Sequence, residues 1–212
     1  SDVCSSDLIG MAISMRLQKL KSRVFVMIGD GECAEGSVWE AAELAPKLKL
    51  NNLVAILDAN RLGQSGESLH GHKIKEWETK WKAFGWNTFV VDGHNVNQIC
   101  KALHRVRTKT GPCILIAKTF KGRGVSFLEN KEGWHGKPLK PDLLASALKE
   151  LGPVPEVDAK KLVRKPLKAQ FPRLRKGKVS GPAYHLGDMV ATRQAYGTML
   201  AKLDRKSTRL NS

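Results

Sequence analysis

Short apolar runs alternate along the chain with longer stretches in which apolar residues recur every three or four positions. Four runs rich in β-branched residues predict strands, at residues 23–28, 52–57, 87–91 and 113–117. The first run is continuously apolar, as is typical of a strand that is buried on both faces of a sheet. The helical spacing predicts helices at residues 9–20, 37–48, 74–84, 96–107, 141–151 and 189–203.

The alternation of strands and helices predicts the fold class. A β-α-β order is typical of an α/β protein whose mainly parallel sheet is flanked by helices. Such sheets bind ligands beyond the carboxyl ends of their strands, so the loops after the four strands are the candidate binding region. The longest of these loops, residues 119–139, is rich in glycine and polar residues. A loop of that length is usually functional or disordered.

Charge separates one tract from the rest of the chain. The 212 residues carry a formal net charge of +16, and nine Lys and Arg residues lie between Asp158 and Lys178 with only Asp158 to oppose them. This tract predicts a solvated basic linker at residues 153–182 and no nucleic-acid site, because aromatic residues for base stacking are nearly absent from it. No apolar run approaches the roughly 20 residues that span a bilayer. We therefore expect a soluble, cytoplasmic protein that binds no membrane.

Both ends of the chain and its cysteines carry further information. Residues 1–8 and 205–212 bear no relation to the patterns they adjoin and resemble translated sequencing-adaptor sequence, so we predict that both are extraneous. The four cysteines are Cys4, Cys33, Cys100 and Cys113. None forms a C-x-x-C pair with another, so we expect reduced thiols and neither a zinc site nor a disulfide framework.

The first predicted strand ends on Gly29-Asp30-Gly31, which fits the loose G-x-G-x-x-G/A pattern of a dinucleotide-binding turn. The second strand ends at Asp58, where a ribose-binding acid could stand, so a nicotinamide-dependent oxidoreductase is one hypothesis. Asp30 argues against it, because a carboxylate ~4 Å from a phosphate charge is repelled by ~4 kcal/mol at an effective dielectric constant of ~20. A divalent cation between the two charges reverses the sign of that interaction.

A metal at Asp30 needs further oxygen ligands, and the next loop offers them. Asn60 lies just beyond the second strand, in LDANRLGQS. Neighbouring parallel strands end at the same edge of a sheet, so Asp30 and Asn60 are expected to converge, with a main-chain carbonyl just past Asn60 as a third ligand. Either residue alone could belong to an ordinary turn. Together they favour a site for a divalent metal and a diphosphate.

The sequences of these loops and of several later motifs resemble those of transketolases. GDGECAEGSVWEA and LDANRLGQS are similar to the thiamine-diphosphate motif of that family, and DGHNV, IAKTFKGRG, WHGKPL and ATRQAYG match it in order. The resemblance implies a homodimeric enzyme that uses thiamine diphosphate and Mg²⁺ (or Ca²⁺ or Mn²⁺). Such an enzyme transfers a two-carbon ketol unit from a ketose phosphate to an aldose phosphate. A non-catalytic, transketolase-like interaction protein is the remaining hypothesis.

The resemblance also implies roles for individual residues, which fall into four groups. The metal ligands are Asp30, Asn60 and the main-chain carbonyl of Leu62. The cofactor contacts are Asp30, Gly31, Asn60, Lys121 and His135. The sugar-phosphate contacts are His135 and Arg193. The catalytic residues are His135, beside the reactive ring of the cofactor, and Glu35, in a proton relay between the two active sites of the dimer.

Three local patterns have structural interpretations. Ser37-x-x-Glu40 has the spacing of a capping box, and Asp188 is a possible N-cap of the last helix. His94, in DGHN, is expected to be structural or to cap its loop.

The domain boundaries follow from these motifs. Residues 9–152 are predicted to form a diphosphate-binding domain that is incomplete at its start, and residues 183–204 the first helix of a truncated pyrimidine-binding domain. The family activates the pyrimidine of the cofactor with a glutamate from that second domain, usually of the partner subunit. We therefore predict that this chain alone has no transketolase activity.

Overall fold

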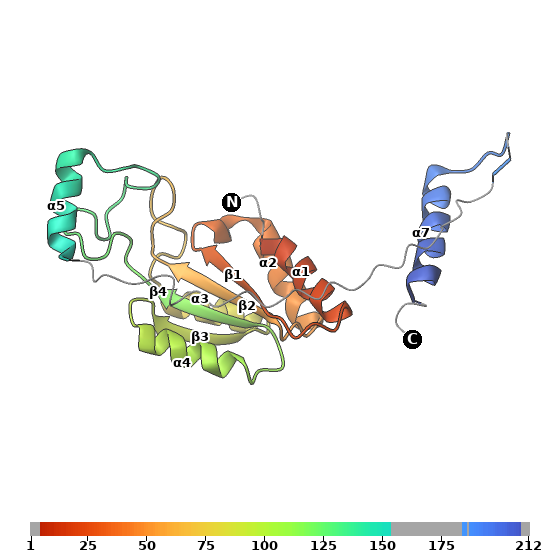
Figure 1. Cartoon of the computed structure of the whole chain (residues 1–212), viewed down its shortest axis with the longest axis horizontal. Coiled ribbons are helices and arrows are strands. Elements are labelled where there is room, and N and C mark those ends of the chain that lie inside the picture. The colour runs from red at the N-terminus through yellow and green to blue at the C-terminus, as the bar shows by residue number, and fades with distance from the viewer. Residues whose placement is uncertain (1–4, 154–183, 186, 209–212) are drawn as a thin grey trace. The chain divides into compact units, whose positions relative to one another are not determined.

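The chain forms two compact units, Ser1–Val163 and Arg164–Ser212. The computed structural model describes residues 5–153, 184–185 and 187–208. Most of the predicted basic linker, residues 153–182, lies outside them. In the second unit, helix α7 (Thr192–Thr208) is the described element, drawn in blue in Figure 1. It begins after the predicted N-cap, and Asp188 instead accepts a hydrogen bond through Oδ2 from the amide of His185, at 2.8 Å. The N-cap prediction is therefore wrong.

The first unit is built on a four-stranded sheet whose strand order is β1-β2-β4-β3 (Figure 1). The strands are β1 (Val24–Gly29), β2 (Leu53–Ala59), β3 (Asn87–Asp92) and β4 (Cys113–Lys118). All three neighbouring pairs are parallel, and the last residues of β1 and β2 lie near each other because Gly29 pairs with Asp58. The predicted α/β class with a parallel sheet and flanking helices is confirmed.

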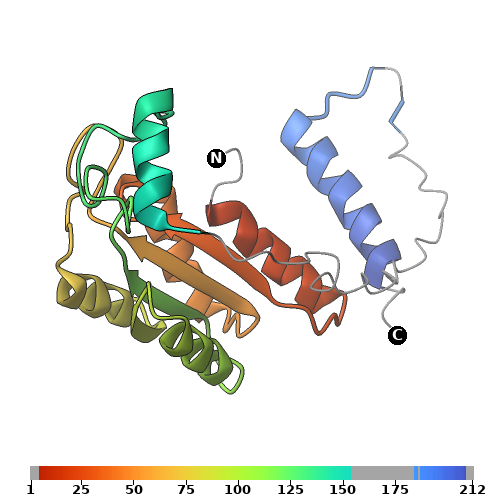
Figure 2. The ribbon, with the colours of Figure 1, turned by 60° about the vertical axis from the view of Figure 1, so that its left-hand side comes forward.

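Helices cover the two faces of the sheet unequally. They are α1 (Ser5–Leu17), α2 (Gly36–Lys47), α3 (Ile74–Ala83), α4 (Val96–Val106) and α5 (Pro141–Leu151). The first three share one hydrophobic core with Val24, Val26 and Ile28 of β1, whereas α4 packs through Ala102 and Val106 on the opposite face. Helix α5 lies beyond the carboxyl ends of the strands (Figures 1 and 2). Among the helices that the structure describes, none has the length and apolarity needed to cross a membrane.

Strand β1 corrects one prediction. Its residues alternate between buried and exposed, and Phe25 and Met27 are 55% and 68% exposed. The strand is therefore buried on one face within this chain and not on both. The reason is positional, because β1 is the edge of the sheet, and among the described residues the hydrophobic cluster that contains α4 includes residues of β2, β3 and β4 but none of β1. A continuous apolar run does not reveal how far a covering helix extends.

The core beneath α2 and α3 is built from aromatic rings. Trp77 and Trp81 are each 1% exposed. The ring of Trp81 lies 5.3 Å from that of Trp39 and 5.0 Å from that of Trp86, measured between centroids. Such offset and edge-to-face pairs stabilise a core beyond the area that they bury. The cluster joins both helices to the sheet that carries the strand ends.

The ends of the helices test two further predictions. Helix α2 begins at Gly36 with Glu35 as its N-cap residue, and no side chain caps it, so the capping box from Ser37 to Glu40 is not formed. The interpretation of His94 is confirmed, because its Nε2 accepts a hydrogen bond from the amide of Phe120 at 2.8 Å. His94 therefore anchors the start of the long loop after β4.

The described cysteines, Cys33, Cys100 and Cys113, are free. Burial, and then the negative charge of Glu32, raises the pKa of the Cys33 thiol to about 12, and burial raises that of Cys113 to about 11. Cys100 is exposed. Because the thiolate is the reactive form, iodoacetamide at pH 8 should modify Cys100 about 10-fold or more faster than Cys33. Peptide mass spectrometry measures the rates, and guanidinium should remove the difference. Equal rates in the native chain would contradict the burial of Cys33.

Candidate functional site

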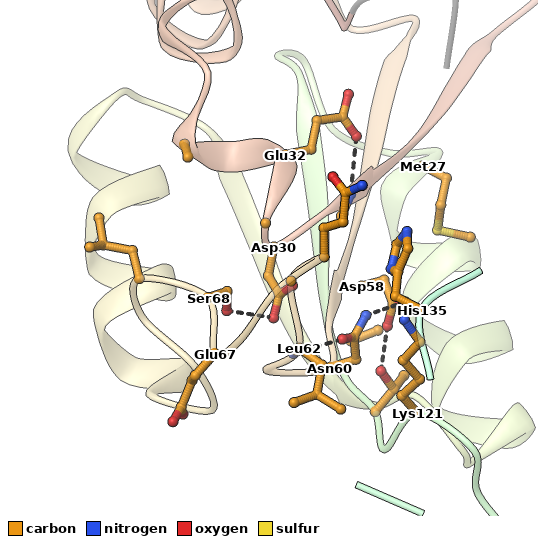
Figure 3. Close-up of a pocket in the computed structure, with 18 of the residues that line it drawn as sticks. Met27, Asp30, Glu32, Asp58, Asn60, Leu62, Glu67, Ser68, Lys121 and His135 are labelled. Carbon is orange, nitrogen blue, oxygen red and sulfur yellow. Dashed lines mark hydrogen bonds between the residues drawn. The ribbon is translucent and has the colours of Figure 1, made fainter. Parts of the chain in front are cut away.

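A pocket of about 1320 Å³ opens at the carboxyl ends of β1, β2 and β4, the edge at which parallel sheets bind ligands (Figure 3). It gathers all but one of the predicted site residues, which are Asp30, Gly31, Glu35, Asn60, Leu62, Lys121 and His135. The exception is Arg193, which is exposed and belongs to the second unit, so its contact with a sugar phosphate stays a prediction.

Asp30 is a buried carboxylate, 3% exposed, at the end of β1. Its Oδ2 accepts two hydrogen bonds, from the main-chain amide of Arg61 at 2.6 Å and from Ser68 Oγ at 2.9 Å. Burial raises the pKa of Asp30, and these hydrogen bonds, with one from the Gly31 amide, oppose that shift only in part. The charged carboxylate is therefore costly in the protein alone, and a cation beside it would offset that cost.

Asn60 and Asp58 hold each other in place at the end of β2. Asn60 Nδ2 donates to Asp58 Oδ2, and Asn60 Oδ1 accepts from the amide of Leu62, each at 2.9 Å (Figure 3). The other carboxylate oxygen of Asp58 accepts from the hydroxyl of Thr119, just past β4. Both oxygens of Asp58 are thus engaged within the protein. This arrangement counts against Asp58 as the ribose-binding acid of a nicotinamide site.

The carbonyl of Leu62 is left outside the local hydrogen-bond ladder. Leu62 pairs with Glu67 in an isolated antiparallel bridge. The hydrogen bonds of that bridge come from the amides of the flanking residues, Gly63 at 2.7 Å and Ser68 at 2.8 Å. Among the described residues, no amide of this turn donates to the Leu62 carbonyl, so both lone pairs of its oxygen are available to a metal ion.

Gly31 allows the loops after β1 and β2 to approach closely. A Cβ atom at this position would lie 3.3 Å from the Cα of Gly63, which is tighter than an ordinary contact. Its φ of −67° is open to any residue, so the need for glycine comes from the close approach and not from the backbone conformation. A side chain here would push apart the two loops that carry Asp30 and Asn60.

Lys121 and His135 lie side by side in the long loop after β4, with Lys121 Nζ 3.0 Å from His135 Nδ1 (Figure 3). A charged ammonium group can only donate, so Nδ1 is the acceptor in this contact and a neutral ring carries its proton on Nε2. The pair brings one cation and one imidazole into the pocket. The structure thus unites the two loop residues that the sequence proposed for the cofactor.

In the part of the chain that the structure describes, the carboxylate of Glu35 makes no hydrogen bond or ion pair. Its side chain lines the pocket, the residue is exposed, and its amide donates to the carbonyl of Glu32 at 3.0 Å. Its part in a proton relay stays a prediction.

Sequence reasoning missed three residues that hold the site together, Arg61, Ser68 and Thr119. Ser68 reaches Asp30 only because the Leu62–Glu67 bridge folds the loop back, and no strand end marks it in the sequence. Thr119 is a polar residue directly after β4, and this position at a strand end is the feature of the sequence that could have identified it.

The donor set of the pocket suits a hard cation. In the part of the chain that the structure describes, no three His, Cys, Asp or Glu side chains gather closely enough to hold a metal ion. An ion in this pocket must therefore take amide, main-chain and ligand oxygens in addition to Asp30. Mg²⁺ prefers such a set, with one or two carboxylates and the phosphates of its partner. The residues present fit a metal and diphosphate.

Comparison with known proteins gives a consistent picture. A family described as "Transketolase, thiamine diphosphate binding domain" matches residues 14–206. The chain is 45% identical over 206 residues to mouse transketolase-like protein 2 and 42% identical to human transketolase, in each case over 95% of this chain. It spans about a third of those relatives, 33% and 32% of their lengths.

Solved structures agree with this assignment. Transketolase from Campylobacter jejuni superposes with a TM-score of 0.63 and 27% identity, over 69% of this chain and 24% of that one. Transketolase from Pichia stipitis in complex with sedoheptulose-7-phosphate superposes with a TM-score of 0.61 and 25% identity, over 69% of this chain and 23% of that one. The chain therefore belongs to the transketolase family, and the region matched is that family's thiamine diphosphate binding domain.

Proposed function

We propose that this chain supplies the metal and diphosphate half of a transketolase active site. The observation that carries the proposal is Asp30, a buried carboxylate whose pKa is raised by burial, set beside Asn60 and the Leu62 carbonyl. The proposed ion is Mg²⁺, with Ca²⁺ or Mn²⁺ as substitutes, bound by these three oxygens and by the diphosphate.

The remaining residues have distinct proposed tasks. Thiamine diphosphate, when bound, supplies the nucleophilic carbon and the electron sink for cleavage of a carbon–carbon bond. The ammonium group of Lys121 contributes positive charge beside the cofactor and fixes the His135 ring through their 3.0 Å contact. His135 presents the proton on Nε2 to an oxygen of the sugar. Glu35 takes part in proton relay, and Arg193 binds the phosphate end of the sugar through its guanidinium.

The whole protein is proposed to act on sugar phosphates as a homodimer. The Pichia stipitis relative was solved with sedoheptulose-7-phosphate, a ketose phosphate of the class that two-carbon transfer requires. The dimer is proposed because the pyrimidine of the cofactor needs a glutamate from a second domain, beyond the pocket described above. The alternative is a non-catalytic transketolase-like protein, for which a full-length frame without that glutamate would be the signature.

Calorimetry on the 212-residue chain tests the proposal. Thiamine diphosphate should bind weakly when Mg²⁺ is present and give no heat when EDTA removes the ion. Turnover of a ketose phosphate donor by these 212 residues should be undetectable, since they span only about a third of the length of the relatives, 33% and 32%. Binding of NAD without metal would contradict the proposed function, and measurable turnover would contradict the predicted inactivity of the isolated chain.

A further inference from the structure

Arg61 has a backbone conformation that is unusual for a residue with a long side chain. Its φ of 76° lies in the left-handed region, which is strained for a non-glycine residue and persists only where the surroundings enforce it. In this conformation its amide donates the 2.6 Å hydrogen bond to Asp30 Oδ2. The strain therefore lies at the residue that orients the proposed metal ligand.

The guanidinium of Arg61 reaches a second loop. Nε donates to Asn130 Oδ1 at 3.0 Å and Nη2 donates to the carbonyl of Asn130 at 2.9 Å. A third nitrogen, Nη1, lies 3.4 Å from a carboxylate oxygen of Glu67, and 22% of the Arg61 side chain is exposed. Two parallel hydrogen bonds from a planar guanidinium fix both distance and direction. Neither Arg61 nor Asn130 lines the pocket, so any effect they have on a ligand there is indirect.

Asn130 links Arg61 to Lys121, which lines the pocket. It also has a left-handed backbone, with φ of 57°, and its amide donates to the carbonyl of Lys121 at 2.8 Å. Lys121 in turn contacts His135. A continuous series of hydrogen bonds thus connects Asp30 to His135 through Arg61, Asn130 and Lys121.

We propose that Arg61 is a positioning residue that holds the proposed metal loop and the loop of Lys121 and His135 in one fixed arrangement. Its amide orients Asp30, and its guanidinium holds residues 121–130 through Asn130. Because both loops are already ordered before thiamine diphosphate binds, less conformational entropy is lost on binding. This inference rests on the proposed function, because the ligand named is the cofactor of that site.

The decisive variant is Arg61→Gly in the 212-residue chain. Glycine adopts the left-handed conformation without strain and keeps the amide that donates to Asp30, so the variant deletes the Arg61 side chain and leaves this main-chain hydrogen bond in place. Amide hydrogen exchange of residues 119–136 should become faster, whereas exchange of β1, β2 and β4 should stay unchanged. The affinity for thiamine diphosphate in saturating Mg²⁺ should fall about 10-fold or more, because the loop of Lys121 and His135 must then be ordered on binding.

Two further variants calibrate this result. Arg61→Lys keeps the charge but loses the planar pair of hydrogen bonds, so its exchange rates and affinity should lie between those of the wild type and Arg61→Gly. Arg123→Lys is the matched control in the same loop, because Arg123 is half exposed and makes a single 3.4 Å ion pair with Glu129. It should behave as the wild type.

Wild-type exchange in residues 119–136 of Arg61→Gly would overturn the proposal. Faster exchange across the whole sheet would also overturn it, since that would show a general loss of stability and not the local loss of the Arg61–Asn130 contact. Exchange is measured on the unliganded chain, so it tests whether Arg61 holds the loop of Lys121 and His135 even if the wild type fails to bind thiamine diphosphate. Failure of the wild type to bind with Mg²⁺ would instead contradict the proposed function.

Discussion

Replacing Asp30 by asparagine should weaken magnesium-dependent binding of thiamine diphosphate about 100-fold or more, while the unliganded chain becomes more stable. Loss of a residue that merely orients a metal ligand lowers metal affinity about 10- to 100-fold. Loss of the ligand itself should lower the affinity by at least that much. Asparagine keeps an oxygen that can accept from Ser68 and from the Arg61 amide, and it removes a charge that is buried and 3% exposed. Affinity is read by calorimetry and stability by urea denaturation.

The pH dependence gives this prediction a sign. Because burial raises the pKa of Asp30 in the folded chain, folding favours the protonated form. Stability from this group is present at low pH and is lost as pH rises through the folded pKa. The stability advantage of Asp30→Asn should therefore be absent at low pH, grow as pH rises from the ordinary pKa of an aspartate towards the raised pKa of folded Asp30, and stay constant above it. Affinity for the metal and cofactor in the wild type should change in the opposite direction and rise with pH, since the metal requires the ionised carboxylate.

The matched control is Asp92→Asn, an aspartate at the end of β3 that lies outside the pocket of Asp30 and is exposed. It should leave magnesium-dependent binding unchanged. Tight binding by Asp30→Asn would refute the assignment of the metal to this carboxylate. Equal stability of Asp30→Asn and wild type at every pH would show that the Asp30 charge is not penalised by burial.

Replacing Trp81 by alanine should lower the free energy of unfolding by about 3–5 kcal/mol, the range typical of a buried tryptophan or phenylalanine. Trp81 is 1% exposed and contacts the rings of Trp39 and Trp86, so its loss opens a cavity between α2, α3 and the sheet. Total stabilities of domains are only about 5–15 kcal/mol, and the variant would therefore be close to unfolding. Urea denaturation followed by circular dichroism measures the change.

Trp81→Phe separates packing from hydrogen bonding. Among the described residues, no partner accepts from the buried Trp81 Nε1, whereas Trp77 Nε1 donates to the carbonyl of Gly71 at 3.3 Å. Phenylalanine at position 81 thus removes an unsatisfied donor and should cost less than Trp77→Phe, which breaks a hydrogen bond. The reverse order, or a loss below about 1 kcal/mol for Trp81→Ala, would contradict this view of the core. The Phe pair stays informative if Trp81→Ala does not fold.

The residues of the candidate site that lie directly after predicted strands could be predicted from the sequence. Asp30 and Asn60 each follow an apolar run, and parallel neighbours must bring such positions to the same edge of the sheet. The prediction failed where the relevant contact was not periodic. Helix α2 begins at Gly36, with Glu35 as its N-cap residue and without the expected capping box. One face of β1 is exposed, because how far a covering helix extends is not encoded in the apolar run of the strand.

The sequence by itself determined the class of fold, the order of the loops and the residue types that meet in the pocket, because apolar periodicity and glycine placement act over a few neighbouring positions. Only the tertiary structure decided how those residues are held. The contacts of Arg61 with Asn130, of Ser68 with Asp30 and of Thr119 with Asp58 join positions 38 to 69 residues apart. Side-chain hydrogen bonds between distant loops leave no repeating pattern in the chain, so they become visible only when the folded backbone brings donor and acceptor together.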